Sequence, residues 1–101
     1  VKEVKNPEEF GVIELGKNKI INLHEKPKDY ISSLAVVGLY IYQYSCFEYI
    51  QLLEPSDRGE LEITDLNKVY MNNELLDFHI LKSWWVDAGT EDRIEHLKKL
   101  I

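Results

Sequence analysis

The feature that most constrains the fold of this 101-residue chain is the run AVVGLYIYQY at positions 35–44. β-Branched and aromatic residues dominate it, and its side chains alternate with the period of two that is typical of a β-strand. The two faces of this strand would carry Val37, Leu39 and Ile41 on one side, and Gly38, Tyr40, Tyr42 and Tyr44 on the other. The fold must therefore contain a β-sheet, and we expect this segment to be its strongest strand.

Short strands and helices are predicted to alternate along the rest of the chain. Two apolar runs flank GKNK at 16–19, whose Gly and Asn tolerate a positive φ, so residues 10–15 and 20–25 should form a hairpin. Pro27 ends the second strand and should hold Lys26 in an extended conformation. Two further strands are expected at 75–81 and 84–87. This order predicts an α/β class with a mixed sheet, an opening β-hairpin and flanking helices.

Three helices are expected from apolar residues at helical spacing. The first begins after Ser45 and the second spans an apolar face from Ile63 to Tyr70. The third begins after Thr90, which should act as its N-cap, with acidic residues in the first turn where the helix dipole favours them. We expect the third helix to bury Ile94, Leu97 and Ile101.

Composition limits the classes of partner. Eighteen acidic and 12 basic side chains give a formal net charge of −6, which disfavours nucleic acid and anionic membrane surfaces because both require a basic face. No apolar run approaches the ~20 residues needed to span a bilayer. The chain is long enough for one domain at most. A single cysteine, Cys46, allows no internal disulfide, so a reducing, cytoplasmic location is expected.

Glu25 and Lys26 form the first candidate functional pair. Glu25 continues the apolar face of Ile21 and Leu23, so its carboxylate must either reach water at the end of the strand or line a polar cleft. A salt bridge at the end of the strand is the simpler interpretation, and a binding role is the alternative.

Gly38 and Tyr40 are candidates of a second kind. A glycine inside a strand of strong β-formers indicates either a bulge or the close approach of a ligand to the backbone. Tyr40 shares its face with Tyr42, and such tyrosines are most often half-buried packing beneath a helix, although they could also support a ring-shaped ligand.

Asp87 lies where a strand would turn into a helix through Ala88 and Gly89. In α/β sheets ligands bind at the carboxyl ends of strands, and an aspartate there can hold a hard cation such as Mg²⁺. Capping of the following helix by Asp87 or Thr90 explains the same residues equally well. The three histidines are scattered without zinc spacing, and no cysteine partners them.

The stretch RGELEITD at 58–65 places charges around Gly59 just before a helix. Glu60 and Glu62 near the positive end of the helix dipole would be favourable in any solvated helix entrance. The alternative is a positioning loop in which Arg58 faces phosphate and the acidic residues orient Arg58 and Lys26.

Taken in order, the motifs GVIEL, INLHEKP, VVGLYIY, PSDRGELEITDLNKVY and WWVDAGT resemble the sugar-1-phosphate nucleotidyltransferases, with the thymidylyl branch most similar. The resemblance covers essentially the whole chain. It implies a Rossmann-like nucleotidyltransferase fold and an enzyme that joins a nucleoside triphosphate, with dTTP expected, to glucose 1-phosphate, giving a nucleotide-sugar and pyrophosphate. It also implies Mg²⁺ as the cofactor.

The resemblance assigns expected roles to individual residues. It places Glu25 on the sugar hydroxyls, Lys26 on the sugar phosphate, and the backbone at Gly38 against the sugar. The remaining expected site residues are Tyr40 and Trp85 beside the substrate, Arg58 near the phosphates in a catalytic role with Lys26, and Asp87 as one of two metal-binding aspartates.

Some parts of the family pattern are not present in this sequence. The Gly-rich G-x-G-[ST]-R-L loop that binds the triphosphate and the other metal aspartate both lie upstream in the family, and DAGT stands where DTGT is commoner. Residues 1–101 are therefore expected to be the sugar-phosphate-binding half of a longer enzyme, without its nucleotide-binding half and inactive alone. The alternatives are a stand-alone sugar-phosphate-binding or regulatory module, and an α/β domain with decayed sites. The family also makes a homo-oligomer one option.

Overall fold

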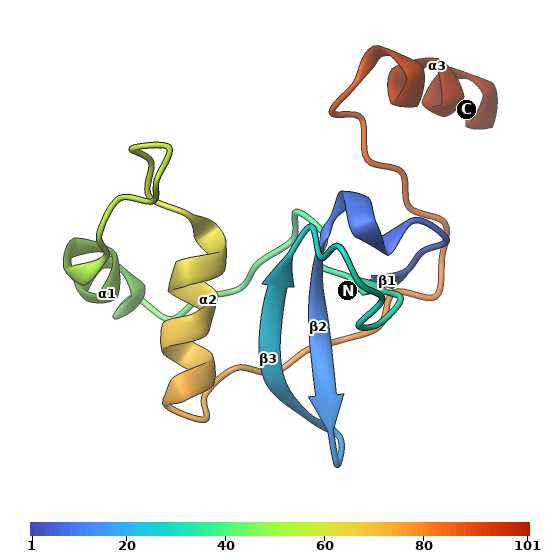
Figure 1. The fold of residues 1–101 in the computed structure, drawn as a ribbon. Coiled ribbons are helices and arrows are strands. Elements are labelled where there is room, and N and C mark those ends of the chain that lie inside the picture. The colour runs from blue at the N-terminus through green and yellow to red at the C-terminus, as the bar shows by residue number, and fades with distance from the viewer.

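A computed structural model describes residues 1–101, and Figure 1 shows their arrangement. A hairpin stands at the centre, with α1 and α2 on one side and β1 with the short helix η1 on the other. In chain order the elements are β1 (Lys2–Glu3), η1 (Pro7–Glu9), β2 (Gly11–Gly16), β3 (Lys19–Glu25), β4 (Leu34–Ala35), α1 (Cys46–Leu52), α2 (Ile63–Asn72) and α3 (Glu91–Leu100).

The predicted hairpin is confirmed as β2 and β3. Lys17 and Asn18 connect the strands, with φ of 52° and 66°, the left-handed conformations that a tight two-residue hairpin turn requires. The ladder pairs Gly16 with Lys19 at the turn and Gly11 with Glu25 at the far end, with one irregularity between Glu14 and Leu15. The hairpin thereby brings Gly11 beside Glu25.

The sheet has four strands in the order β1-β4-β2-β3. All three strand pairings are antiparallel, and β4 joins the hairpin through Val12 opposite Ala35. The buried residues of the sheet are Val12, Ile13, Leu23 and Ala35, and Val37 just beyond β4 is buried as well. Together with the flanking helices, this sheet confirms the predicted α/β class with an opening hairpin, although its pairings are all antiparallel where a mixed sheet was predicted.

Helices α1 and α2 pack against each other around a small second core. Cys46, Leu66 and Tyr70 are its buried members. Tyr42 packs on this core and donates its phenol hydrogen to Oδ1 of the buried Asn67 at 2.5 Å. Burial, reinforced by neighbouring Tyr40, raises the pKa of Tyr42 to about 12, so this phenol stays a donor at any ordinary pH. The packing interpretation of the tyrosine face therefore holds at Tyr42.

The predicted helix boundaries are largely confirmed, and two details are not. Thr90 caps α3 as expected, because its side chain accepts from the backbone N–H of Arg93 at 3.4 Å. Ser45 occupies the N-cap position of α1 without a capping hydrogen bond from its side chain. Helix α3 stands apart from the sheet in Figure 1 and has no buried residue, so the predicted burial of Ile94, Leu97 and Ile101 is wrong for this chain.

The long strand predicted at 35–44 is the main correction. Only Leu34–Ala35 is a strand, and the ladder continues by a single bond, from the N–H of Val36 to the carbonyl of Gly11 at 2.8 Å. Most side chains beyond it are exposed, with Leu39 at 68% and Ile41 at 94%, although Val37 is buried. The strands predicted at 75–81 and 84–87 are likewise wrong. A strand requires a neighbour to pair its backbone groups. Residues 79–81 pair only with Val1, and no strand of the sheet lies alongside the other segments.

The core is therefore shallow for a chain of this length. Nine of 101 residues are buried, while large apolar side chains are exposed on all three α-helices and along the segments between them. None of the helices is long and apolar enough to cross a membrane. The structure thus combines a well-formed hairpin with extended apolar segments that have no partner.

Two tyrosine-to-phenylalanine variants test the second core. The Tyr70 hydroxyl is buried without a hydrogen-bond partner, so Tyr70→Phe is expected to leave the free energy of unfolding unchanged or to raise it by about 1 kcal/mol. Tyr42→Phe orphans the buried Asn67 amide oxygen and should cost about 1–2 kcal/mol. Urea denaturation of both variants measures the difference, and a larger loss for Tyr70→Phe would contradict the assignment.

Candidate functional site

Glu25 ends β3 with its carboxylate held in place. Its Oε2 accepts from the hydroxyl of Thr64 at 3.2 Å, which joins the end of the hairpin to the first turn of α2. Gly11 lies directly opposite, and a Cβ at that position would stand 2.9 Å from the same oxygen. The glycine therefore leaves the space that the carboxylate occupies. Glu25 is exposed and forms no salt bridge, so the strand-end ion pair considered for it does not form.

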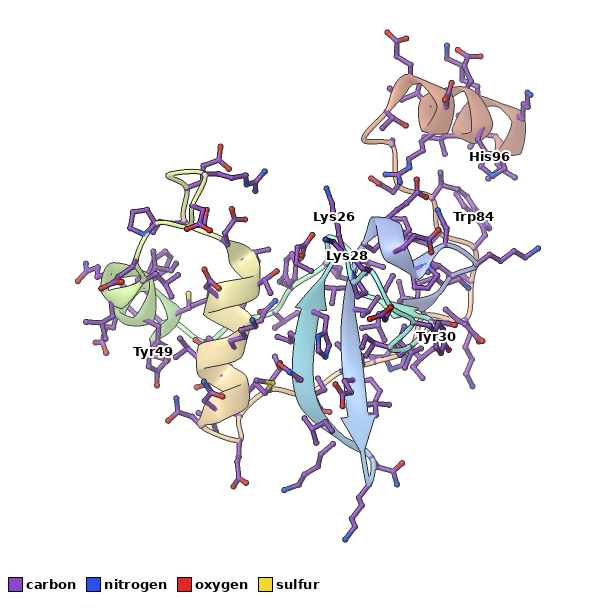
Figure 2. All side chains as sticks on the ribbon, in the orientation of Figure 1. Lys26, Lys28, Tyr30, Tyr49, Trp84 and His96 are labelled. Atoms are coloured by element: carbon purple, nitrogen blue, oxygen red, sulfur yellow. The ribbon has the colours of Figure 1, made fainter.

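Lys26 departs from the extended conformation predicted for it. Its φ is 44°, in the left-handed region, which costs a side-chain-bearing residue roughly 1–2 kcal/mol. Its N–H still donates to the carbonyl of Phe10 at 3.0 Å, so the ladder bond is kept while the chain turns sharply away before Pro27. Figure 2 shows Lys26 and Lys28 at this end of the hairpin. None of the seven ion pairs involves Lys26, so its ammonium group is uncommitted.

Tyr40 lies close enough to Glu25 for their charges to interact. Burial, and then the Glu25 carboxylate, raises the pKa of Tyr40. Its ring stacks on Tyr42 with centroids 6.0 Å apart and an interplanar angle of 18°. At Gly38 a Cβ would meet nothing within 4 Å, so packing in this chain does not require a glycine there. The space beside Gly38 is open to a ligand or to another segment.

Arg58 is held by the acidic residues of its own loop. Its guanidinium donates to Oε1 of Glu62 at 2.8 Å and lies 3.5 Å from Glu60. The same Glu62 oxygen accepts from the hydroxyl of Ser56 at 3.0 Å. The hydrogen bond to Glu62 is the main cause that raises the pKa of Arg58, and the bond from Arg58, then that from Ser56, lowers the pKa of Glu62. The acidic residues do orient Arg58, as a positioning loop requires, but they do not reach Lys26.

Trp85 and Asp87 form a second group next to the hairpin. The ring of Trp85 meets that of Phe10 edge-on at 5.7 Å. Oδ1 of Asp87 accepts from the N–H of Gly89 at 3.1 Å, and Oδ2 accepts from the guanidinium of Arg93. Arg93 also lies 5.1 Å over the Phe10 ring and 3.5 Å from Glu9. Figure 2 places the neighbouring Trp84 on this side of the molecule, below α3.

Asp87 would supply Mg²⁺ with one carboxylate ligand and no more. No group of three or more His, Cys, Asp or Glu side chains comes together in this chain in a way that could hold a metal ion. Both carboxylate oxygens of Asp87 already have protein donors. A cation at this position would need Arg93 to move and would take its other ligands from outside the chain.

Phe10 connects the two groups. Its carbonyl accepts from Lys26, while its ring contacts Trp85 and Arg93. The structure therefore places Glu25, Lys26 and Tyr40 at the same end of the hairpin, and links Trp85 to them through Phe10 and Asp87 through Phe10 and Arg93. Sequence reasoning missed the supporting residues Phe10, Gly11, Thr64 and Arg93. Only Gly11 carried a local signal, as a glycine at the start of a strand.

Comparison with known proteins gives the family. The nucleotidyl transferase family matches residues 1–101. A glucose-1-phosphate thymidylyltransferase of Neisseria meningitidis is 40% identical over 98% of this chain and 35% of its own length. The bifunctional protein GlmU of Methanococcus maripaludis is 51% identical over 85% of this chain and 22% of its own length. The chain belongs to the nucleotidyl transferase family.

A solved structure extends this similarity to the fold. The crystal structure of a candidate glucose-1-phosphate thymidylyltransferase from Bacillus anthracis, in complex with sucrose, matches with a TM-score of 0.89 and 44% identity. The match covers 98% of this chain and 40% of that chain, which confirms the nucleotidyltransferase fold for these residues. The chain spans about a third of the length of the thymidylyltransferases it matches.

The ion pair in the 58–65 loop can be tested by titration. Because the folded state lowers the Glu62 pKa, the stabilising contribution of the pair is present above the ordinary glutamate range and is lost as the pH falls through the lowered value. NMR titration of the Glu62 carboxyl carbon should give a midpoint below that of a model peptide. In Arg58→Gln the midpoint should rise towards the ordinary value, and an unchanged midpoint would contradict the pairing.

Proposed function

We propose that this chain is the sugar-phosphate-binding part of an enzyme that transfers a nucleotidyl group to a sugar 1-phosphate. The products would be a nucleotide-sugar and pyrophosphate. The observation that carries the proposal is the end of the hairpin, where Glu25, whose carboxylate is held by Thr64, is followed by Lys26, whose ammonium group forms no ion pair. A carboxylate accepts from sugar hydroxyls, and an ammonium group binds phosphate as a point charge. Glu25 and Lys26 therefore match the two ends of a sugar 1-phosphate.

The proposed reaction is an in-line displacement at phosphorus. An oxygen of the sugar phosphate forms a bond to the α-phosphorus of the triphosphate, and the bond from that phosphorus to the bridging oxygen breaks to release pyrophosphate. The phosphate oxygen is already ionised, so no protein nucleophile is required, and catalysis consists of positioning and charge neutralisation. Lys26 would hold the attacking phosphate. Arg58 would supply a second positive charge near the phosphates, and Glu62 would aim it.

The choice of substrates rests on the relatives. Thymidylyltransferases acting on glucose 1-phosphate recur among the matched proteins, which supports glucose 1-phosphate and dTTP as the pair. Gly38 would let the sugar approach the backbone, and Tyr40 and Trp85 would flank it. Open space at Gly38 and the proximity of Tyr40 to Glu25 support this placement.

Mg²⁺ is the proposed cofactor, with Asp87 as one of its ligands. When bound, the cation would neutralise negative charge on the phosphates. This chain supplies one carboxylate and spans only part of the length of its relatives. The proposal therefore includes that residues 1–101 alone do not catalyse the reaction.

A lysine pair tests the phosphate contact. Lys26→Ala is expected to weaken glucose 1-phosphate binding roughly tenfold to a hundredfold, because a hydrogen bond to a charged group contributes about 1.5–3 kcal/mol. Lys28→Ala is the matched control, since it removes an exposed ammonium group at the same end of the hairpin. Isothermal titration calorimetry measures both variants, and equal losses would contradict the assignment to Lys26.

A glycine pair tests the sugar contact. In Gly11→Ala the new Cβ would displace the flexible Glu25 carboxylate from Thr64, so sugar-phosphate binding should weaken several-fold while the melting temperature changes little. Gly38→Ala meets no protein atom, so any loss of binding must come from the ligand itself. Calorimetry and thermal denaturation are measured together. Normal binding by Gly38→Ala would remove Gly38 from the site, and normal binding by Gly11→Ala would do the same for Glu25.

A further inference from the structure

Helix α2 carries two polar side chains on one face, Thr64 and Asn67. They are three residues apart, so they lie one above the other on the helix, which stands beside β3 in Figure 1. The hydroxyl of Thr64 donates to Glu25 at 3.2 Å. Oδ1 of Asn67 accepts from the hydroxyl of Tyr42 at 2.5 Å. One helix face therefore contacts both the carboxylate at the end of β3 and the aromatic segment that follows β4.

Asn67 is a buried amide in an otherwise apolar core. It is 6% exposed, and it is the one buried residue that is neither apolar nor aromatic. Its helix neighbours Leu66 and Tyr70 form the core with Cys46. Burying an amide costs free energy unless it is hydrogen-bonded, so an apolar residue would serve packing better. The bond from Tyr42 is the hydrogen bond that the Asn67 side chain makes, and it is therefore the feature that the amide provides.

Tyr42 transmits this constraint to Tyr40. The two rings stack with centroids 6.0 Å apart and planes inclined by 18°, and Tyr42 also meets the ring of Tyr70 at 5.5 Å. No strand of this chain includes Tyr40, so no backbone ladder fixes it here. Burial, and then the nearby Glu25 carboxylate, raises the pKa of Tyr40. The place of the Tyr40 ring beside Glu25 thus depends on Tyr42, and the place of Tyr42 depends on Asn67.

We propose that Asn67 is a positioning residue for the sugar, because its bond to Tyr42 keeps the Tyr40 ring in place. Helix α2 then fixes both sides of the sugar, one through each of its two polar side chains. The inference rests on the proposed function, in which Glu25 accepts from the sugar hydroxyls and Tyr40 flanks the sugar. Asn67 is buried and does not touch the ligand, and the phosphate contact at Lys26 does not depend on it.

Two substitutions at Asn67 separate positioning from stability. Asn67→Asp keeps an oxygen that accepts from Tyr42 but buries a carboxylate, so it should destabilise the chain while the Tyr40 ring stays in place. Asn67→Leu keeps the branched shape without the polar atoms, so it should keep the stability but release Tyr42. The freed hydroxyl can bond to water, since Tyr42 is only half-buried. A role in stability alone predicts the opposite order for the two variants.

Two ligands report on the site. Inorganic phosphate tests the phosphate contact alone, and glucose 1-phosphate tests the sugar contact as well, so the ratio of the two affinities isolates the sugar. Both are measured with the full 101-residue chain by calorimetry or ³¹P NMR titration. Asn67→Leu should lower the ratio about threefold to tenfold, as expected for the loss of one aromatic contact, and leave inorganic phosphate binding unchanged. Asn67→Asp should keep the ratio of the unaltered chain.

Two tyrosine variants make the test specific to one hydrogen bond. Tyr42→Phe removes the donor to Asn67, so it should lower the ratio as Asn67→Leu does, and the double variant should lose no more than either single variant. Tyr70→Phe is the matched control. It removes a buried hydroxyl of the same core that has no hydrogen-bond partner, and it should change neither affinity.

NMR contacts between the ring protons of Tyr40 and Tyr42 report the ring position without any ligand. They should weaken in Asn67→Leu and persist in Asn67→Asp. Unchanged ring contacts in Asn67→Leu, an unchanged affinity ratio, or an equal loss of inorganic phosphate binding would each overturn the inference. An unaltered chain that binds no glucose 1-phosphate would overturn the proposed function, and the ring contacts would still decide whether Asn67 positions Tyr40.

Discussion

The antiparallel ladder between β2 and β3 is the constraint on which the rest of the structure depends. Its register places Gly11 opposite Glu25, so the carboxylate has room to turn towards Thr64. A shift of one residue would send every side chain of β3 to the other face and separate these groups. The ladder also ends in the bond from Lys26 to the carbonyl of Phe10, whose ring contacts Trp85. One hairpin thus sets the positions of Glu25 and Lys26 and, through Phe10, contacts Trp85.

Lys26 shows how this ladder shapes the site. Keeping the bond to Phe10 while leaving the strand before Pro27 requires a sharp turn, and the backbone makes it at φ 44°. A residue with a side chain is strained there, and glycine would remove the strain. Strained backbone of this kind tends to occur at functional positions, where the side chain is required. The strain supports a role for the Lys26 side chain, which no protein contact otherwise explains.

Features that depend on nearby residues could be predicted from the sequence, and features that depend on distant ones could not. The turn at Lys17 and Asn18 and the Thr90 cap are decided within a few residues, and both were predicted correctly. The run at 35–44 has the composition of a strand, but a strand also requires a partner, and this chain supplies none beyond Ala35. The bond between Thr64 and Glu25 joins residues 39 apart, so no local pattern could reveal it. The resemblance predicts the candidate site residues, and the structure shows which residues contact them.

The negative net charge of the chain explains why phosphate binding must depend on individual cationic side chains. A chain of net charge −6 repels phosphate at long range, so phosphate binding depends on cations that acidic neighbours have not neutralised. Arg58 is paired with Glu62 and Glu60, and Arg93 with Asp87 and Glu9, which lowers the net positive charge that either presents. Lys26 carries its full charge into solvent beside the fixed Glu25 carboxylate. In the proposed site, the first contact with a sugar phosphate would therefore fall to Lys26, and Arg58 would contribute only as far as a phosphate competes with Glu62.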